Sequence, residues 1–175
     1  MLYPNIKLVA FDFDDTVYIH PRHNYSKEED LLLFTKIVVR DNEVYPSERF
    51  NPVMLDFMKA CYAEGISIAL CSRCSLAKEA DYKIFTLEAL TGITIENLCV
   101  GDNSLKPVVL QAYADAYRIA PSNILFVDDL WYNLEAAENA GFKTASPSEI
   151  TMFMMKRPIA TTSKQGVKPV TMSNT

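Results

Sequence analysis

The sequence predicts an α/β fold with a doubly wound parallel sheet. Four short apolar runs, at 6–11, 66–70, 95–100 and 124–127, have the length and composition of strands that are buried on both faces. Segments whose apolar residues recur at helical spacing follow these runs, so strands and helices alternate along the chain. With 175 residues, of which 49% are hydrophobic, the chain is long enough for one sizeable core and short for two independent domains.

The segment 51–64 has signals for both ends of a helix. Asn51 is a suitable N-cap, and Pro52 fits the first helical position because no backbone N–H is needed there. Gly65 directly follows the expected end. The apolar residues in between recur at helical spacing: Met54, Phe57, Met58, Cys61 and Tyr62. We expect this helix to bury that face against the sheet.

Further helices are expected at 75–90, 107–118 and 130–140, each after one of the apolar runs. The sequence SPSE at 146–149 has the spacing of a capping box, which predicts a last short helix through Met155. Because strands and helices alternate, we expect right-handed crossovers between parallel strands.

Two segments break this alternation. Residues 17–46 form an insertion after the first strand, with a polar loop, IHPRHNYS, followed by a helix expected at about 27–39. Residues 157–175 are polar, rich in Ser and Thr and without apolar periodicity, which predicts a mobile tail. We therefore expect one core over 1–156 that carries a small flap, with the tail outside it.

Composition and charge argue against several classes of protein. The net charge of −5, without any run of Lys or Arg, argues against binding nucleic acid through bulk electrostatics. No stretch has the roughly 18 uninterrupted apolar residues of a membrane span, and the first residues lack the pattern of an export signal, so we expect a cytoplasmic protein. The four cysteines are then expected to be reduced core thiols rather than a disulfide frame.

The stretch KLVAFDFDDTVYIH, from Lys7 to His20, raises an electrostatic question. Its apolar run ends in three carboxylates, Asp12, Asp14 and Asp15, within four positions. Like charges at this spacing repel each other, so a bound cation, a raised pKa or exposure to solvent must make them tolerable.

Ligand sites of open α/β sheets lie off the carboxyl ends of the strands. The polar residues expected at or near those ends are Asp12, Asp14, Thr16, Ser72, Lys106, Asp128 and Asp129. Carboxylates, hydroxyls and one ammonium group are therefore expected to meet in one crevice.

Four motifs on these residues, DFDDT, ALCS, KP and LFVDD, occur in the order and context typical of the haloacid dehalogenase-like (HAD) hydrolases. The chain resembles that superfamily over roughly residues 6–150, including an alanine-rich helix and a glycine after the paired aspartates. The resemblance implies a Rossmann-like core. Because Asp14 is present two positions after Asp12, it also implies phosphoryl transfer rather than cleavage of carbon–halogen bonds.

By this resemblance, Asp12 is the nucleophile that forms an aspartyl-phosphate, and Asp14 is the general acid for the leaving oxygen and then the base for the hydrolytic water. Mg²⁺ is the implied cofactor, because a divalent cation lets an anionic ester approach a carboxylate. Asp12 and Asp129 are the implied carboxylate ligands, and Asp14 offers its backbone carbonyl. Asp128 is implied as a ligand through water or as a supporting acid. A bound cation would also offset the repulsion among the carboxylates that follow the first strand.

The resemblance further implies that Ser72 and Lys106 hold the phosphoryl oxygens. Thr16 is placed with the substrate-binding residues, chiefly as the residue that orients the first loop. Asn133 either bonds to the site loop or is an ordinary exposed helix residue. Asp15 replaces the hydrophobic or glycine residue often found at its position, and we expect it to point away from the metal.

The insertion at 17–46 leaves room for a minimal cap only, so the site is expected to be open. Open sites suit large substrates, or small ones that a partner subunit encloses, so a homo-oligomer is one option. The candidate substrate contacts are His20, Arg22, His23 and Arg73. The expected partner is a phosphorylated substrate, and a sugar phosphate, a nucleotide and a macromolecular phosphate all remain open.

Two alternatives come from other classes of protein. Cys71 and Cys74 form a CxxC pair after a strand and before a helix, a pattern typical of thioredoxin-like redox proteins. That interpretation leaves the aspartates and the lysine unexplained, and a zinc site lacks a second CxxC pair. The other alternative is a HAD-like domain that binds ligands without catalysis, although no motif points to a loss of activity.

Overall fold

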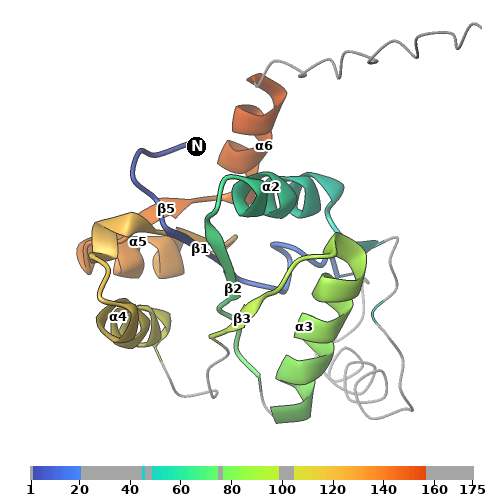
Figure 1. The fold of residues 1–175 in the computed structure, drawn as a ribbon, viewed down its shortest axis with the longest axis horizontal. Helices are drawn as coiled ribbons and strands as arrows, with labels where there is room; N and C mark the ends of the chain where they lie inside the picture. The colour runs from blue at the N-terminus through green and yellow to red at the C-terminus, as the bar shows by residue number, and fades with distance from the viewer. Residues whose placement is uncertain (1, 21–44, 46–48, 75–76, 99–104, 157–175) are drawn as a thin grey trace, which may run out of the picture.

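The structure is a computed structural model that describes residues 2–20, 45, 49–74, 77–98 and 105–156 (Figure 1). The helix expected within the insertion, most of the insertion itself and the expected tail lie outside these residues. The minimal cap and the mobile tail therefore stay predictions.

Five parallel strands form one sheet, in the order β3-β2-β1-β4-β5. Their bounds are Leu8–Phe11 (β1), Ser67–Leu70 (β2), Glu96–Asn97 (β3), Ile124–Val127 (β4) and Lys143–Ala145 (β5). From the central strand β1 the chain first builds one side of the sheet and then crosses back to build the other. The predicted α/β class and doubly wound parallel sheet are confirmed.

The predicted apolar runs contain β1 to β4, whereas β5 has no counterpart in the sequence prediction. Lys143 and Thr144 begin β5, and neither residue belongs to an apolar run. The strand lies at the edge of the sheet, where partial exposure removes the need for continuous apolar residues. A short edge strand of this kind leaves too weak a pattern to be read from the sequence.

The described α-helices are α2 (Pro52–Ala63), α3 (Ala77–Thr91), α4 (Lys106–Tyr117), α5 (Trp131–Asn139) and α6 (Pro147–Lys156). Asn51 caps α2 as predicted, since its side chain accepts a hydrogen bond from the Val53 N–H at 3.1 Å. The predicted capping box at α6 is also present, because Ser146 and Glu149 each accept a hydrogen bond from the other's backbone N–H. Among the described helices, none combines the length and hydropathy that crossing a bilayer needs.

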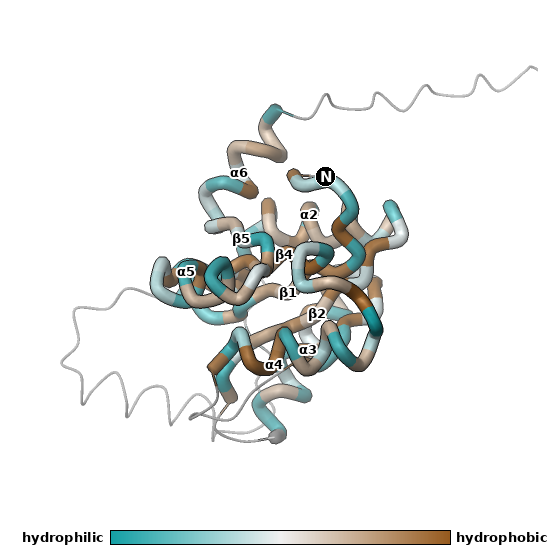
Figure 2. Tube along the Cα trace, turned by 90° about the vertical axis from the view of Figure 1, so that its left-hand side faces the viewer, coloured by the Kyte–Doolittle hydropathy of each residue, from teal (hydrophilic) through white to brown (hydrophobic). Residues whose placement is uncertain are grey.

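The helices cover the two faces of the sheet in different sets, because alternate strand residues point to opposite faces. One face packs with α2, α3 and α6 and contributes Val9, Phe11, Ile68, Leu70, Leu125 and Val127. The other packs with α4 and α5 and contributes Leu8, Ala10, Ala69, Cys71, Ile124 and Phe126. Figure 1 shows α6 beside α2 and α4 beside α5, and in Figure 2 the hydrophobic segments gather along the strands. With both faces covered, polar groups gather at the ends of the strands.

Candidate active site

The carboxyl ends of β1 and β4 lie side by side. The two strands are parallel neighbours, with Phe11 paired to Val127. The Asp12 N–H donates to the Val127 carbonyl at 2.8 Å, which continues the pairing beyond the strand ends. Asp12 follows β1 and Asp128 follows β4, so both side chains come to the same edge of the sheet.

Asp12, Asp128 and Asp129 form a cluster of carboxylates at this edge, which we call the three-acid cluster. One oxygen from each residue lies within 4.8 Å of the others. Asp12 and Asp128 are buried, whereas Asp129 is exposed. Three carboxylates this close repel each other unless positive charge lies between them, and their oxygens are the hard ligands that Mg²⁺ prefers. The donor set therefore fits the predicted cation.

Lys106 neutralises part of the three-acid cluster. It is the first residue of α4 and is buried, and its Nζ donates to Asp12 Oδ1 and to Asp128 Oδ2, each at 2.7 Å. An ammonium group has three N–H donors. Within the described part of the chain two of them are engaged by these carboxylates, so one is left for a ligand.

Asp128 is fully buried, and both of its oxygens accept hydrogen bonds. Oδ1 accepts from the Leu130 N–H at 2.8 Å, while Oδ2 accepts from Lys106. The Asn133 amide lies 3.1 Å and 3.0 Å from the two oxygens, so the first of the two roles considered for Asn133 is the one observed. With its lone pairs shared among these donors, Asp128 is better suited to support the cluster than to bind a cation directly.

Thr16 orients Asp129. Its side chain is fully buried, and its hydroxyl oxygen accepts from the Asp129 N–H at 3.0 Å. The same hydroxyl donates its hydrogen to Asp129 Oδ1 at 3.3 Å. A hydroxyl engaged in this way has no hydrogen left for a substrate, so its placement favours a role in holding the cluster over the substrate contact expected from the sequence.

Asp14 lies in a second group of charges, outside the three-acid cluster. Its Oδ1 lies 2.8 Å from His20 Nε2, and its Oδ2 accepts from Lys83 Nζ at 2.9 Å. The next residue, Asp15, is exposed and adopts the left-handed backbone with φ of 56°, which an aspartate tolerates. Its carboxylate accepts from the His20 N–H at 3.0 Å and so faces the loop after β1.

Lys83 has no role in the sequence predictions, yet it is central to this second group. It lies on α3, is only 1% exposed, and places its Nζ 3.1 Å from Ser72 Oγ and 3.1 Å from Glu79 Oε1. The signal in the sequence is its spacing. Lys83 shares a buried helical stripe with Ala80 and Leu87, and the buried Glu79 lies one turn before it, so a charge on this face has a partner of opposite sign at i−4.

The two groups shift the pKa values of their aspartates in opposite directions. Burial raises the pKa of Asp12 to about 7, although the neighbouring Lys106 opposes this shift. Burial also acts on Asp14, but the hydrogen bonds and charges of His20 and Lys83 outweigh it and lower the pKa of Asp14 to about 2. Two carboxyl groups held so differently at one sheet edge are typical of a functional site.

The expected substrate contacts are only partly described. Arg22 and His23 lie outside the described residues. Arg73 is exposed, and its backbone carbonyl accepts from Lys83 Nζ at 3.4 Å. His20 is held against Asp14, so of the two described candidates, His20 and Arg73, it is His20 that contacts a carboxylate of the site.

The CxxC pair lies within the protein core. Cys71 and Cys74 are both buried. Exchange with a disulfide requires a thiolate that reaches another sulfur, and burial works against both ionisation and access. Among the described residues, no cysteine belongs to a group suited to hold a metal. The described part of the chain therefore offers no observation in favour of the redox or zinc alternatives.

The start of α5 carries an exposed aromatic side chain close in sequence to the three-acid cluster. Trp131 comes two residues after Asp129 and is 71% exposed. Its ring meets that of Tyr132 edge-on, with ring centroids 6.0 Å apart. It is also the only tryptophan of the chain. The segment after β4 thus passes directly from the carboxylates of the three-acid cluster to a solvent-exposed indole.

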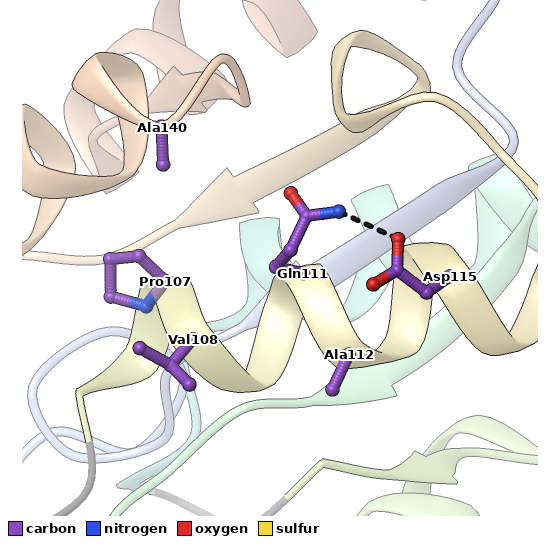
Figure 3. A pocket seen from close by; sticks show the side chains of 6 residues that line it. All are labelled: Pro107, Val108, Gln111, Ala112, Asp115 and Ala140. Atoms are coloured by element: carbon purple, nitrogen blue, oxygen red, sulfur yellow. Dashed lines mark hydrogen bonds between the residues drawn. The ribbon is translucent and has the colours of Figure 1, made fainter.

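The hollow drawn in Figure 3 lies in the groove between α4 and α5. It has a volume of about 440 Å³ and is lined by Pro107, Val108, Gln111, Ala112, Asp115 and Ala140. Gln111 Nε2 donates to Asp115 Oδ1 at 2.8 Å within it. None of the lining residues belongs to the three-acid cluster or to the group around Asp14, so the hollow is separate from the candidate chemistry.

Comparisons by sequence find no relative: no family model matches the chain, and no curated protein matches it. Comparisons by structure do find similar proteins. One is a HAD-family enzyme of Bacteroides thetaiotaomicron in complex with magnesium and inorganic phosphate, with 13% identity, a TM-score of 0.50, and coverage of 81% of this chain and 93% of that one.

A second similar structure is the N-terminal part of a Bacteroides fragilis protein, which contains a phosphatase domain complexed with Mg; it has 14% identity and a TM-score of 0.53 and covers 87% of this chain. A third is a hypothetical protein from Xanthomonas campestris, with 18% identity, a TM-score of 0.50 and 81% of this chain covered. The chain spans only 40% and 64%, respectively, of these two. The likeness and the sheet order together show that the described part of the chain has the fold of the HAD-family hydrolases, as the sequence motifs predicted.

Proposed function

We propose that the protein is a Mg²⁺-dependent phosphomonoester hydrolase that works through an aspartyl-phosphate intermediate on Asp12. The observation that carries the proposal is the three-acid cluster around Lys106, at the carboxyl edge of a sheet with the HAD-type fold. Carboxylates gathered beside one ammonium group are arranged to bind a cation and an anion together, which is what hydrolysis of a phosphate ester with Mg²⁺ requires.

In the first step, an oxygen of Asp12 attacks the phosphorus atom, and the bond between phosphorus and the leaving oxygen breaks. The His20 and Lys83 partners keep Asp14 charged in the free protein, so Asp14 first takes up a proton from solvent when the anionic ester binds. It then donates this proton to the leaving oxygen, and the leaving group departs as a neutral alcohol. The remaining N–H of Lys106 and the hydroxyl of Ser72 donate to phosphoryl oxygens, where negative charge is stabilised in the transition state.

In the second step, Asp14 accepts a proton from a water molecule whose oxygen attacks the phosphorus atom. The bond between phosphorus and the Asp12 oxygen breaks, which releases inorganic phosphate and restores the Asp12 carboxylate. Asp14 has then given one proton and taken one back, which it returns to solvent, so every side chain regains its starting state.

The carboxylates of Asp12 and Asp129 would hold the Mg²⁺ ion, with the backbone carbonyl of Asp14 as a further ligand and Asp128 in support. When bound, the cation supplies the positive charge that lets an anionic ester approach Asp12. Thr16 contributes by fixing the backbone and side chain of Asp129 through its hydroxyl.

The proposed substrate is a phosphomonoester, either a small molecule or the phosphorylated end of a macromolecule. A panel of sugar phosphates, nucleotides and phosphopeptides, ranked by kcat/KM, distinguishes these classes. A steep preference for one class assigns the substrate, and equal low values across the panel point to a class that the panel lacks.

The proposal is tested with p-nitrophenyl phosphate. We expect hydrolysis in Mg²⁺, loss of activity in excess chelator and recovery when Mg²⁺ is restored. Asp12→Asn should remain folded and lose activity by roughly 10³-fold or more, because the amide is a poor nucleophile of nearly the same shape. Asp56→Asn, on the exposed side of α2, is the matched control and should keep wild-type activity.

Two results would contradict the proposal. Asp12→Asn with near wild-type rates would show that another group attacks the phosphorus atom. A folded wild-type protein that binds Mg²⁺ and inorganic phosphate, but hydrolyses no member of the panel, would instead support the non-catalytic binding domain.

A further inference from the structure

Lys83 is a lysine held in an almost completely buried position, with only 1% of its surface exposed. An ammonium group is costly to bury unless negative or polar partners surround it. Phe13 covers one side of it, with the ring centroid 4.9 Å from Nζ. A charge retained in such a position calls for an explanation, because an apolar residue of similar size would fill the space without that cost.

The partners of Lys83 use all of its hydrogen-bonding capacity. Its Nζ lies 2.9 Å from Asp14 Oδ2, 3.1 Å from Ser72 Oγ and 3.1 Å from Glu79 Oε1, with the Arg73 carbonyl at 3.4 Å. An ammonium group has three N–H donors, and these acceptors already claim them all. Lys83 therefore has no donor left for a phosphoryl oxygen, in contrast to a lysine that binds substrate.

We propose that Lys83 is a positioning residue that fixes the general acid Asp14 and the phosphate-binding hydroxyl of Ser72 in one rigid arrangement. This inference rests on the proposed function. It assigns Lys83 no contact with the substrate, and its effect passes entirely through the two residues that it holds.

The bond to Ser72 determines how that hydroxyl is used. Lys83 can only donate, so Ser72 Oγ accepts from it and keeps its single hydrogen for another acceptor. Without a ligand that hydrogen faces the Arg73 carbonyl at 3.4 Å, a long and weak contact. A phosphoryl oxygen is a far better acceptor, so Lys83 leaves the Ser72 hydroxyl ready to donate to the substrate.

The bond to Asp14 fixes the direction of the general acid. Lys83 holds Oδ2, and His20 lies against Oδ1, so the carboxyl group is held from two sides. In the proposed reaction Asp14 alternates between a neutral and a charged form. The ion pair between Lys83 and Glu79, four residues apart on α3, persists in both forms and keeps the ammonium group in place.

The test compares two leaving groups in Lys83→Met, a variant of similar size without the charge. An alkyl phosphate needs a proton on its leaving oxygen, whereas p-nitrophenyl phosphate does not. We expect kcat/KM for the alkyl phosphate to fall by about 10²-fold and that for p-nitrophenyl phosphate to fall about tenfold less. The quantity kcat/KM is chosen because it reports the step in which the leaving oxygen is protonated.

Lys78→Met is the matched control, since Lys78 is exposed on the same helix, and it should leave both values unchanged. Lys83→Met leaves Glu79 buried without its partner, so the double variant Lys83→Met with Glu79→Gln is measured beside it. Circular dichroism and thermal melting verify that each variant is folded. The double variant should show the same dependence on the leaving group.

An equal loss on both substrates in the folded variants would overturn the inference, because it would place Lys83 in general stability or phosphate binding. No loss on either substrate would overturn it as well. A wild-type protein inactive on both substrates in Mg²⁺ would overturn the proposed function itself, and the inference would fall with it. Activity in the wild type thus separates the two failures.

Discussion

Lys106 and Lys83 are both buried lysines beside aspartates, but they differ in how completely their partners satisfy them. Lys106 contacts Asp12 and Asp128 within the described part of the chain and keeps one donor. Lys83 has at least as many acceptors as it has donors. The first lysine is thus suited to bind an incoming anion, and the second is suited to hold side chains of the protein.

The charges around the two lysines show the same difference. On the Lys106 side, the three-acid cluster has one ammonium group, which contacts Asp12 and Asp128, so negative charge is in excess and a bound cation would offset it. On the other side, the two carboxylates of Asp14 and Glu79 face Lys83 and His20. Burial raises the pKa of Asp12 despite Lys106, whereas His20 and Lys83 outweigh burial and lower the pKa of Asp14, although only one residue separates the two aspartates.

The largest expected effect is that of Lys106→Met. This variant removes a donor to the phosphoryl group and the countercharge of two carboxylates, so kcat/KM should fall by roughly 10²- to 10³-fold. The loss should be similar for alkyl and aryl phosphates, because both carry the same phosphoryl group. Lys59→Met, on the exposed side of α2, is the control. A loss that depends on the leaving group, like that expected for Lys83→Met, would erase the distinction between the lysines.

A smaller effect is expected on Mg²⁺ affinity, measured by isothermal titration calorimetry. Asp129→Asn removes a proposed carboxylate ligand and should weaken binding by about 10- to 100-fold. Asp14→Asn makes the same chemical change but keeps the backbone carbonyl, so its affinity should stay within a few-fold of wild type. Equal weakening in the two variants would mean that the side chains of Asp14 and Asp129 both bind the cation.

The last expected effect is on the stability of the metal-free protein, and it depends on pH. Folding raises the pKa of Asp12 from 3.8 to about 7, so the folded state holds a proton that the unfolded state releases. The stabilising contribution is complete below pH 4 and is lost as the pH rises to 7. Asp12→Asn removes this dependence, so in chelator the variant should become more stable than wild type as the pH rises through that window.

Urea unfolding at several pH values measures this difference. Each pKa unit corresponds to about 1.4 kcal/mol, so the gap at neutral pH should be on the order of a few kcal/mol and should close near pH 4. A constant gap at every pH would show that burial does not destabilise the charged form of Asp12. Asp56→Asn again serves as the control, because its side chain is exposed.

The sequence predicts the three-acid cluster and Lys106 better than it predicts Lys83, for a physical reason. Asp12, Asp128 and Lys106 lie directly at the end of a strand or the start of a helix, so the parallel order of the sheet is enough to bring them together. Lys83 lies in the second turn of α3, and its position depends on how that helix packs against the loop after β1. Only the spacing of α3 hints at its burial.

The position of a strand in the sheet likewise decides whether the sequence predicts it. Strands buried on both faces leave continuous apolar runs, which is why β1, β2 and β4 are evident in the sequence. The edge strand β5 leaves no such run. The hydroxyl of Thr16 gives no sequence signal for its bond to Asp129 either, because that bond joins residues 113 positions apart.

The exposed indole of Trp131 gives the site a built-in optical reporter. Because the chain has one tryptophan, all of its indole emission comes from a side chain two residues from Asp129. Binding of a divalent cation or of phosphate changes the local electric field there, and indole emission responds to that field. Fluorescence titration should therefore measure occupancy without turnover, for instance in Asp14→Asn, which keeps the proposed carboxylate ligands. Binding and chemistry, which kinetics reports together, become separately observable.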